Sequence, residues 1–288
     1  MKLATFTADR RERVGIVAGD GLVDLSNGAF PATMIGLIEL WPAIEADVRR
    51  FAANAKPHFA LSQVRLRAPV PRPPKILAIG LNYADHIAET GREKPARQVW
   101  FAKMSNAVNG PYDPIQIPLV SKDIDYEAEL VFVIGKRCRH VPKEKAHEVV
   151  FGYCAGNDVS VRDWQFASPQ WILGKSFDTH APFGPWIVTP DEVGDPHALG
   201  IRCILNGEVR QNSNTRELVF NVFDQIAHLS EAMTLEPGDV IFTGTPGGVG
   251  AAMKPPGYMK AGDTVRVEID RIDRIGTLEA RLVPENGM

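Results

Sequence analysis

Cysteine is scarce in this sequence, with three residues (Cys138, Cys154 and Cys203) spread over a chain of 288. Their odd number and wide spacing fit neither a zinc-binding pattern nor a disulfide framework. No apolar run approaches the ~20 residues that a membrane-spanning helix needs. No basic patch or tail accompanies the net charge of −3. We therefore expect a protein of the reducing cytoplasm, with a matrix location as the alternative, that binds neither membranes nor nucleic acid.

Motifs of nucleotide binding and of serine hydrolysis are also missing. The segment 173–176 ends like a phosphate-binding loop, but Pro169 stands where that motif needs a glycine. The glycine-rich segment 244–250 lacks the spacing of a dinucleotide-binding turn, and no serine lies in a GxSxG elbow. The chemistry of this chain must therefore be sought elsewhere.

Residues 1–68 are expected to form a small N-terminal α+β domain. Three short strands precede two helical stretches, and Pro42 is expected to separate these helices and to lie in the first turn of the second, 43–55. The proline-rich segment 68–75 is extended and is interpreted as the link between domains. Residues 69–288 then form the larger domain.

Short strands dominate that larger domain. They are expected at 76–80, 130–135, 151–155, 185–189, 201–206, 239–243, 263–269 and near 275–283, with helices only at 83–90, 143–149 and 219–232. The strands do not alternate with helices. This pattern predicts a β-rich α+β fold and not an alternating βαβ array.

The most informative stretch is 123–135, whose first half alternates strictly. Asp123, Asp125, Glu127 and Glu129 fall on one face of a predicted strand, and apolar residues fall on the other. Like charges in a row repel one another. A bound hard cation such as Mg²⁺, Mn²⁺ or Ca²⁺ would remove that penalty. The alternative is an edge strand that carries acidic residues to prevent aggregation.

A second candidate site lies in the predicted helix 83–90. With Asn82 or Asp85 as the cap, His86 and Glu89 would lie one turn apart. The carboxylate would then fix the imidazole tautomer and make His86 a general base for water. The alternative is an ordinary pair of surface residues on an exposed helix.

Further polar residues follow predicted strands. Asp158 could complete a three-carboxylate site with Glu127 and Glu129, or could simply cap a turn. Lys175 stands among apolar residues and needs an anion nearby, unless its side chain extends to solvent. Gly244 and Thr245 end a strand where backbone N–H groups could bind an oxyanion, or could form a plain turn.

Taken together and in this order, the motifs resemble the fumarylacetoacetate hydrolase family, in its bacterial and domain-containing branch. The similarity covers about residues 74–284 and is carried by 80–86, 126–130, 157–163, 174–177, 206–209, 235–239 and 244–250. One departure is Met104 after Lys103, where relatives often have Lys-Pro.

This resemblance implies a mixed β-roll fold and a homodimer. It implies Mg²⁺ or Mn²⁺ held by Glu127, Glu129 and Asp158, and it makes His86 and Glu89 the water-activating pair on a lid. Lys175, Gln165 and Thr245 would contact substrate, with Arg162 a weaker candidate.

We therefore expect a metal-dependent hydrolase that cleaves a carbon–carbon bond in a β-diketo acid, such as an acylpyruvate, through an enolate. Decarboxylation of oxaloacetate, or hydration or isomerisation of 2-oxo-alkenoates, at the same site are the alternatives, because a fold does not determine the reaction. A non-catalytic carboxylate-binding protein is less favoured, because the chain has both the lid pair and Lys175.

Overall fold

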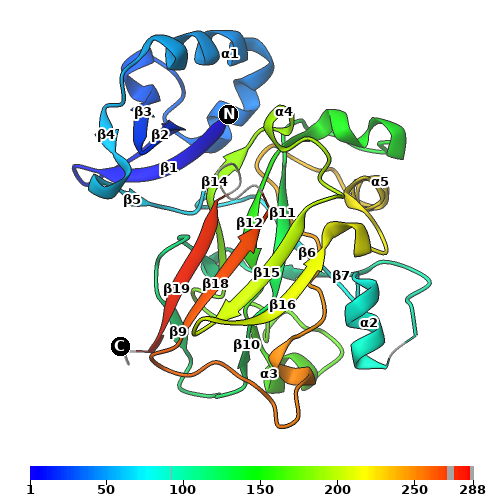
Figure 1. The fold of residues 1–288 in the computed structure, drawn as a ribbon. Coiled ribbons are helices and arrows are strands. Elements are labelled where there is room, and N and C mark those ends of the chain that lie inside the picture. Colours follow the sequence, from blue (N-terminus) through cyan, green and yellow to red (C-terminus); the bar gives the residue numbers. More distant parts are fainter. Residues whose placement is uncertain (92, 271–275, 286–288) are drawn as a thin grey trace.

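A twelve-stranded mixed sheet runs through most of the molecule (Figure 1). The computed structural model describes residues 1–91, 93–270 and 276–285. The strands of this sheet are β1 (Lys2–Ala8), β2 (Arg11–Ala18), β3 (Gly21–Asp24), β4 (Phe59–Ala60), β5 (Arg65–Leu66), β6 (Ile76–Gly80), β7 (Val99–Lys103), β8 (Val108–Asn109), β11 (Ala128–Ile134), β12 (Val150–Asn157), β14 (Ala181–Val188) and β17 (Val240–Phe242). Their main path is β4-β3-β2-β1-β14-β12-β11-β17-β6-β7.

A second sheet of five strands packs against the first. Its order is β16 (Glu208–Asn214), β15 (Gly200–Leu205), β18 (Thr264–Ile269), β19 (Thr277–Pro284) and β9 (Ile115–Ile117). In Figure 1 these strands lie in front of β11 and β12. A small pair, β10 (Ile124–Asp125) with β13 (Ser160–Val161), lies near the ends of β11 and β12. The chain is thus β-rich with mixed α and β structure, as predicted.

Strand β11 is central and has two buried faces. Leu130 and Phe132 belong to the core between the two sheets, whereas Val131 and Val133 belong to the core on the opposite side. The alternation of side chains along a strand produces this division. Asp125, Glu127 and Glu129 are all buried, so the alternative of an exposed edge strand for the acidic stretch is wrong.

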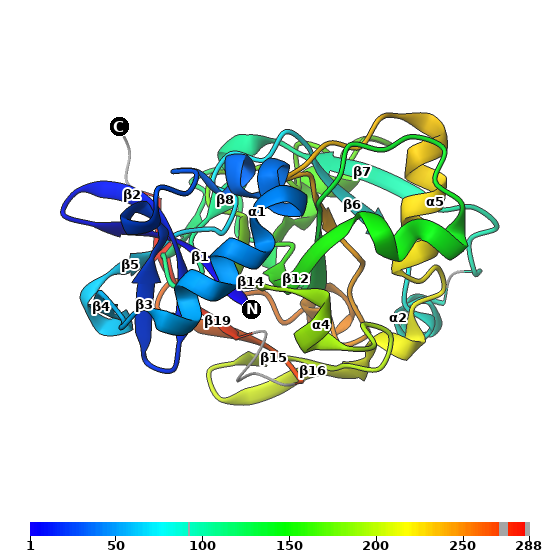
Figure 2. The ribbon, with the colours of Figure 1, turned by 90° about the horizontal axis from the view of Figure 1, so that it is seen from above.

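One continuous helix, α1 (Met34–Asn54), covers that opposite core (Figure 2). The predicted break at Pro42 is wrong, because Pro42 lies inside the helix. An interior proline costs a helix roughly 3 kcal/mol, but each buried apolar side chain contributes about 1.5–3 kcal/mol. Leu37 and Ile38 before Pro42 and Val48 after it are all fully buried. Packing against the sheet therefore outweighs the local penalty.

The remaining helices are short. They are α2 (Ala84–Thr90), α3 (Arg162–Phe166), α4 (Pro190–Val193) and α5 (Val222–Ala232), while Lys143–Val149 forms 3₁₀ turns. Thus both helices predicted near 83–90 and 219–232 exist. Among the described residues no helix is long and apolar enough to cross a membrane.

The N-terminal strands continue the main sheet, since Lys2 and Leu3 of β1 pair with Val188 and Ile187 of β14. The division into domains 1–68 and 69–288 stays a prediction.

Candidate active site

Three carboxylates meet where β11 and β12 end. Glu129 lies in β11, Glu127 precedes that strand, and Asp158 follows β12. Antiparallel pairing brings Glu129 opposite Gly156, and the Asp158 N–H donates to the Glu127 carbonyl over 2.9 Å. Ligand oxygens of the three side chains lie within 4.8 Å of one another, and all three side chains are buried. The sequence predicted this cluster.

The acidic strand is not continuous, however. It is interrupted between β10 and β11 at Tyr126 and Glu127, so Asp125 turns away from the cluster. The Asp125 carboxylate accepts the N–H groups of Gly250 and Ala251 and pairs with Arg162 at 2.7 Å. Asp125 therefore supports the neighbouring loop and does not join the candidate ligands.

Cations surround two of the three carboxylates. The Lys175 Nζ lies 2.7 Å from both Glu127 and Asp158, and Lys103 Nζ lies 2.5 Å from Asp158 on its other oxygen. Arg162 pairs with Glu127 at 2.7 Å. Carboxylate oxygens carry two lone pairs each, so these contacts leave positions for a metal ion.

Glu129 differs from its two neighbours, because it has no ion pair with any described residue. It is 1% exposed and accepts one hydrogen bond, from the Gly244 N–H at 2.7 Å. Burial and the nearby charges of Asp158 and Glu127 raise the pKa of Glu129 well above its ordinary value. For Glu127, burial acts in the same direction, but Lys175 and Arg162 outweigh it and lower the pKa to about 2.

A buried carboxylate that has no ion pair with a described residue, next to two other carboxylates, is suited to bind a divalent cation. All the donors are oxygens, which are the ligands that Mg²⁺, Mn²⁺ and Ca²⁺ prefer. Glu127, Glu129 and Asp158 would hold the ion, and its charge would remove the repulsion that Glu129 meets.

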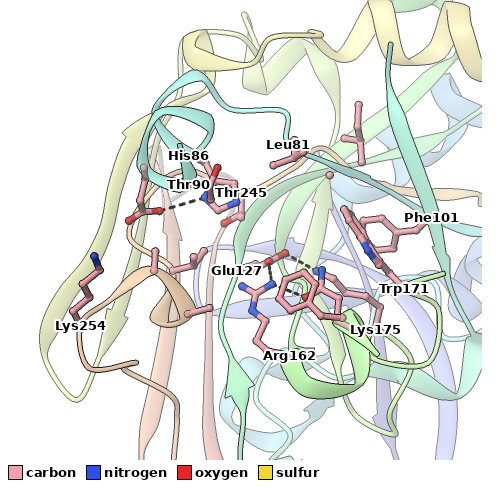
Figure 3. Close-up of a pocket in the computed structure, with 18 residues that line it drawn as sticks. Leu81, His86, Thr90, Phe101, Glu127, Arg162, Trp171, Lys175, Thr245 and Lys254 are labelled. Carbon is pink, nitrogen blue, oxygen red and sulfur yellow. Dashed lines mark hydrogen bonds and ion pairs between the residues drawn. The ribbon is translucent and has the colours of Figure 1, made fainter. Parts of the chain in front are cut away.

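The predicted pair His86 and Glu89 lies on α2, and Figure 3 shows His86 above Glu127. His86 Nδ1 is 3.3 Å from Glu89 Oε2, and Glu89 Oε1 accepts the Gly248 N–H at 2.8 Å. Burial raises the pKa of Glu89, but its hydrogen bonds to His86 and Gly248 prevail, and the net pKa is lowered. Glu89 therefore stays ionised, and its carboxylate is placed to accept a hydrogen bond from Nδ1–H of His86.

The predicted cap of this helix is wrong. Tyr83 occupies the N-cap without a side-chain bond. Asn82 instead donates to the carbonyls of Phe220 and Thr243 and accepts the Phe220 N–H. The Asp85 carboxylate accepts the Gly247 N–H at 3.2 Å and so fastens α2 to the glycine-rich loop.

His86, Glu89 and Glu127 line one cavity of about 440 Å³ together with Arg162 and Lys175. Figure 3 shows Glu127, Arg162 and Lys175 joined by ion pairs, with Phe101 and Trp171 on one side of them and Lys254 on the other. Gln165 and Thr245 also line the cavity. The structure therefore brings the predicted residues together, with Glu129 and Asp158 in contact range of the lining residue Glu127.

The substrate roles of Arg162, Gln165 and Thr245 stay predictions. Arg162 is already bound to Asp125, Glu127 and Gln165. The Thr245 hydroxyl donates to the Ala128 carbonyl and accepts from Gln211.

Three residues that hold the site in place were not predicted from the sequence. Lys103 pairs with Asp158, Asp125 binds the loop at Gly250, and Gln211 bonds to Ala128 and Thr245. A lysine at the end of the apolar run 99–103 was the available signal for the first. The other two depend on contacts across 83 or more residues, which spacing does not reveal.

The comparisons with known proteins agree with this geometry. The family model for the fumarylacetoacetate hydrolase C-terminal domain matches residues 75–283. The chain belongs to the fumarylacetoacetate hydrolase family. The predicted membership and the β-roll fold of this family are thereby confirmed.

Relatives within the family carry several activities in their names. The chain is 43% identical over 279 residues to rat "Oxaloacetate tautomerase Fahd2a, mitochondrial", covering 94% of this chain and 89% of the relative. It is 44% identical over 270 residues to the Xenopus laevis "Oxaloacetate tautomerase fahd2, mitochondrial", covering 91% and 84%. Because both names say mitochondrial, the cytoplasmic location expected for this chain stays a prediction.

Solved structures of family members cover 99% of this chain and all of their own. Maleylpyruvate hydrolase from Sphingobium sp. SYK-6, in complex with manganese(II) and pyruvate, is 35% identical with a TM-score of 0.83. Fumarylacetoacetate hydrolase from Exiguobacterium antarcticum gives the same identity and TM-score. Together with the buried carboxylates, these relatives support a divalent metal site and a fumarylacetoacetate hydrolase-like activity. The identity of the ion and the homodimer stay predictions.

Proposed function

We propose that this chain is a divalent-metal-dependent enzyme that interconverts the keto and enol forms of a 2-oxo dicarboxylic acid such as oxaloacetate. The observation that carries the proposal is one cavity that is lined both by Glu127, a member of the three-carboxylate cluster, and by the pair His86 and Glu89. The names of the rat and frog relatives favour tautomerisation over the other reactions of the family.

Glu127, Glu129 and Asp158 would hold the ion. When bound, a divalent cation polarises a carbonyl and stabilises negative charge that develops on its oxygen. The neighbouring Lys175 ammonium would bind the carboxylate or the 2-oxo oxygen of the substrate through hydrogen bonds.

His86 would move the proton. With Nδ1–H donating to Glu89, Nε2 of His86 would carry a free lone pair. Nε2 would take a proton from C3 of the keto acid, the C–H electrons would form the C2=C3 double bond, and the carbonyl π electrons would move to the oxygen. Protonation of that oxygen completes the enol, and the reverse sequence restores the ketone.

Hydrolysis of a carbon–carbon bond in a β-diketo acid is the second candidate, favoured by the similarity to the maleylpyruvate hydrolase. It would use the same His86 Nε2 to take a proton from water, which attacks the distal carbonyl. The bond to C3 then breaks and leaves a pyruvate enolate. Decarboxylation of oxaloacetate also forms that enolate, but needs no base.

The test assays wild type and His86→Ala with Mg²⁺ or Mn²⁺ for three reactions. These are enol–keto interconversion of oxaloacetate by ultraviolet absorbance, pyruvate release from oxaloacetate, and pyruvate release from an acylpyruvate. We expect wild type to accelerate interconversion and His86→Ala to slow it by about 10²–10⁴-fold, with any decarboxylation retained.

The exposed His228 on α5 provides the matched control, His228→Ala, which should retain full activity. Unchanged interconversion in His86→Ala would contradict the proposed role of this base. A wild type that cleaves acylpyruvates but leaves oxaloacetate enol untouched would replace tautomerisation with hydrolysis.

A further inference from the structure

Lys254 is the cavity cation that the site chemistry does not use. Among the residues that the structure describes, three lysine or arginine side chains line the cavity, and two of them, Arg162 and Lys175, are already in ion pairs with buried carboxylates. Lys254 is exposed and, among the described residues, has no ion-pair or hydrogen-bond partner. It offers the cavity a positive charge that is free to bind a ligand.

Figure 3 places Lys254 on the far side of the Glu127–Lys175 ion pair from Phe101 and Trp171. The lining next to Lys254 in the chain is apolar and small, consisting of Val249, Ala251 and Ala252. A ligand bound by its 2-oxo acid end at Glu127 and Lys175 would thus pass over this apolar wall before it reached the lysine.

The loop that carries Lys254 is held by a buried carboxylate. Asp125, which is fully buried, accepts the N–H groups of Gly250 and Ala251 at 2.8 and 2.9 Å. The Gly257 N–H closes the loop by donating to the Gly250 carbonyl over 2.9 Å. Because Asp125 also binds Arg162, which binds Glu127, one network connects the metal-site carboxylates to the base of the Lys254 loop. The backbone of the loop that carries Lys254 is therefore held in place at the rim of the cavity.

We propose that Lys254 is the specificity-determining residue that binds the second carboxylate of a 2-oxo dicarboxylic acid. The inference rests on the proposed function, which places the 2-oxo acid end at the carboxylate cluster. The inner cations are already paired with the buried carboxylates, so a second ligand carboxylate needs a cation of its own. Lys254 supplies that charge at the rim, where little desolvation opposes the contact.

The alternative is a solvated surface lysine that influences anions only through the overall field of the protein. That field acts on every anion alike and is screened by salt, whereas a direct contact distinguishes ligands by their distal end. Ligand pairs of equal length separate the two explanations: 2-oxoglutarate with 2-oxovalerate, and 2-oxoadipate with 2-oxocaproate. Within each pair a terminal carboxylate replaces a methyl group.

The experiment measures binding of these four acids and of pyruvate to the Mn²⁺-loaded protein by calorimetry. The proteins are wild type, Lys254→Met, Lys254→Arg and Lys260→Met, in which the exposed Lys260 on the neighbouring loop provides the same change in charge. We expect wild type to prefer at least one dicarboxylate over its methyl analogue. Lys254→Met should lower that preference roughly tenfold and leave pyruvate binding within about twofold.

Lys254→Arg should keep most of the preference, and Lys260→Met should keep all of it. If Lys254→Met weakens pyruvate and the dicarboxylates equally, or changes neither, the assignment of Lys254 is wrong while the proposed function stands. If wild type does not bind pyruvate at all in the presence of Mn²⁺, the proposed function itself fails, and the inference about Lys254 fails with it.

Discussion

The inner and outer ends of the cavity are built in opposite ways. At the inner end, Glu127, Glu129 and Asp158 are buried at the ends of two central strands, with Lys103 and Lys175 in direct contact. At the outer end, His86 and Glu89 stand on a helix of seven residues, with side chains 13% and 28% exposed. Lys254 follows a single 3₁₀ turn in a surface loop.

This difference in construction predicts that the inner end determines metal binding and stability and that the outer end determines rate and selectivity. The inner groups are fixed by the sheet and by ion pairs that would leave a buried charge unpaired if broken. The outer helix ends at Gly91 in the left-handed region, with φ of 65°, and is fastened to the glycine-rich loop by hydrogen bonds from Gly247 and Gly248. Changes inside should therefore alter metal binding and stability, whereas changes outside should alter rate and selectivity.

The largest effect is expected from Glu129→Gln. The amide can still accept the Gly244 N–H, and Glu129 has no ion pair to lose with any described residue, so metal-free stability should be equal or higher. Wild type should gain about 2.7 kcal/mol of unfolding free energy at a metal concentration a hundredfold above its Kd. The variant should lose this gain in thermal unfolding, and its turnover should fall by about 10³-fold.

Glu89→Gln is the matched control from the outer end and should keep the full metal-dependent rise. A metal response that survives in Glu129→Gln, or disappears equally in both variants, would remove the distinction between the two ends.

Lys103→Met should have the next largest effect, this time on folding. Lys103 is fully buried against Asp158, and its loss leaves that carboxylate with Lys175 alone. We expect roughly 3 kcal/mol of destabilisation in urea unfolding without metal. Added Mn²⁺ should recover part of it, because the ion supplies positive charge beside Asp158.

The control for Lys103 is Lys143→Met, which removes a half-exposed lysine paired with Asp224. An exposed ion pair contributes about 0–1 kcal/mol, so this change should be small. Equal losses in the two variants would show that burial does not distinguish the inner charges.

The inner end could largely be predicted from the sequence, because its signals are local. Glu127 and Glu129 share a short alternating segment, and Asp158 follows a predicted strand. Lys103 and Asp125 were missed as supports because their roles depend on chain segments that meet only in the folded sheet. The alternation of side chains along a strand predicted Asp125 on the same face as Glu127 and Glu129. The interruption after β10 instead directs its carboxylate to the loop at Gly250.

Most strands of the fold were predicted from their apolar patterns. The helix break predicted at Pro42 was wrong. Local propensity predicts a break there, and only the buried face of α1 against the sheet explains its continuity. The reaction was harder still to predict. Tautomerisation, decarboxylation and hydrolysis all pass through an enolate of a 2-oxo acid, so the same inner residues would suit each of these reactions.

The smallest of these effects, about 10–100-fold in turnover, is expected from Glu89→Gln. Its amide oxygen can keep the Gly248 N–H, so α2 stays fastened, but an NH₂ group now faces His86 Nδ1. His86 Nδ1 must then accept a hydrogen bond from this NH₂ group. The imidazole proton moves to Nε2, and His86 loses the free lone pair that would take the substrate proton. Glu89→Ala loses the Gly248 contact as well and leaves α2 held by the Asp85–Gly247 hydrogen bond, so hydrogen exchange of α2 should be faster in Ala than in Gln. If the tautomer controls the rate, Gln should lose at least as much turnover as Ala, because only Gln forces the imidazole proton onto Nε2. If the Gly248 contact controls the rate, the turnover of Glu89→Gln would stay near that of wild type. Glu89 would then act only by holding α2 in position.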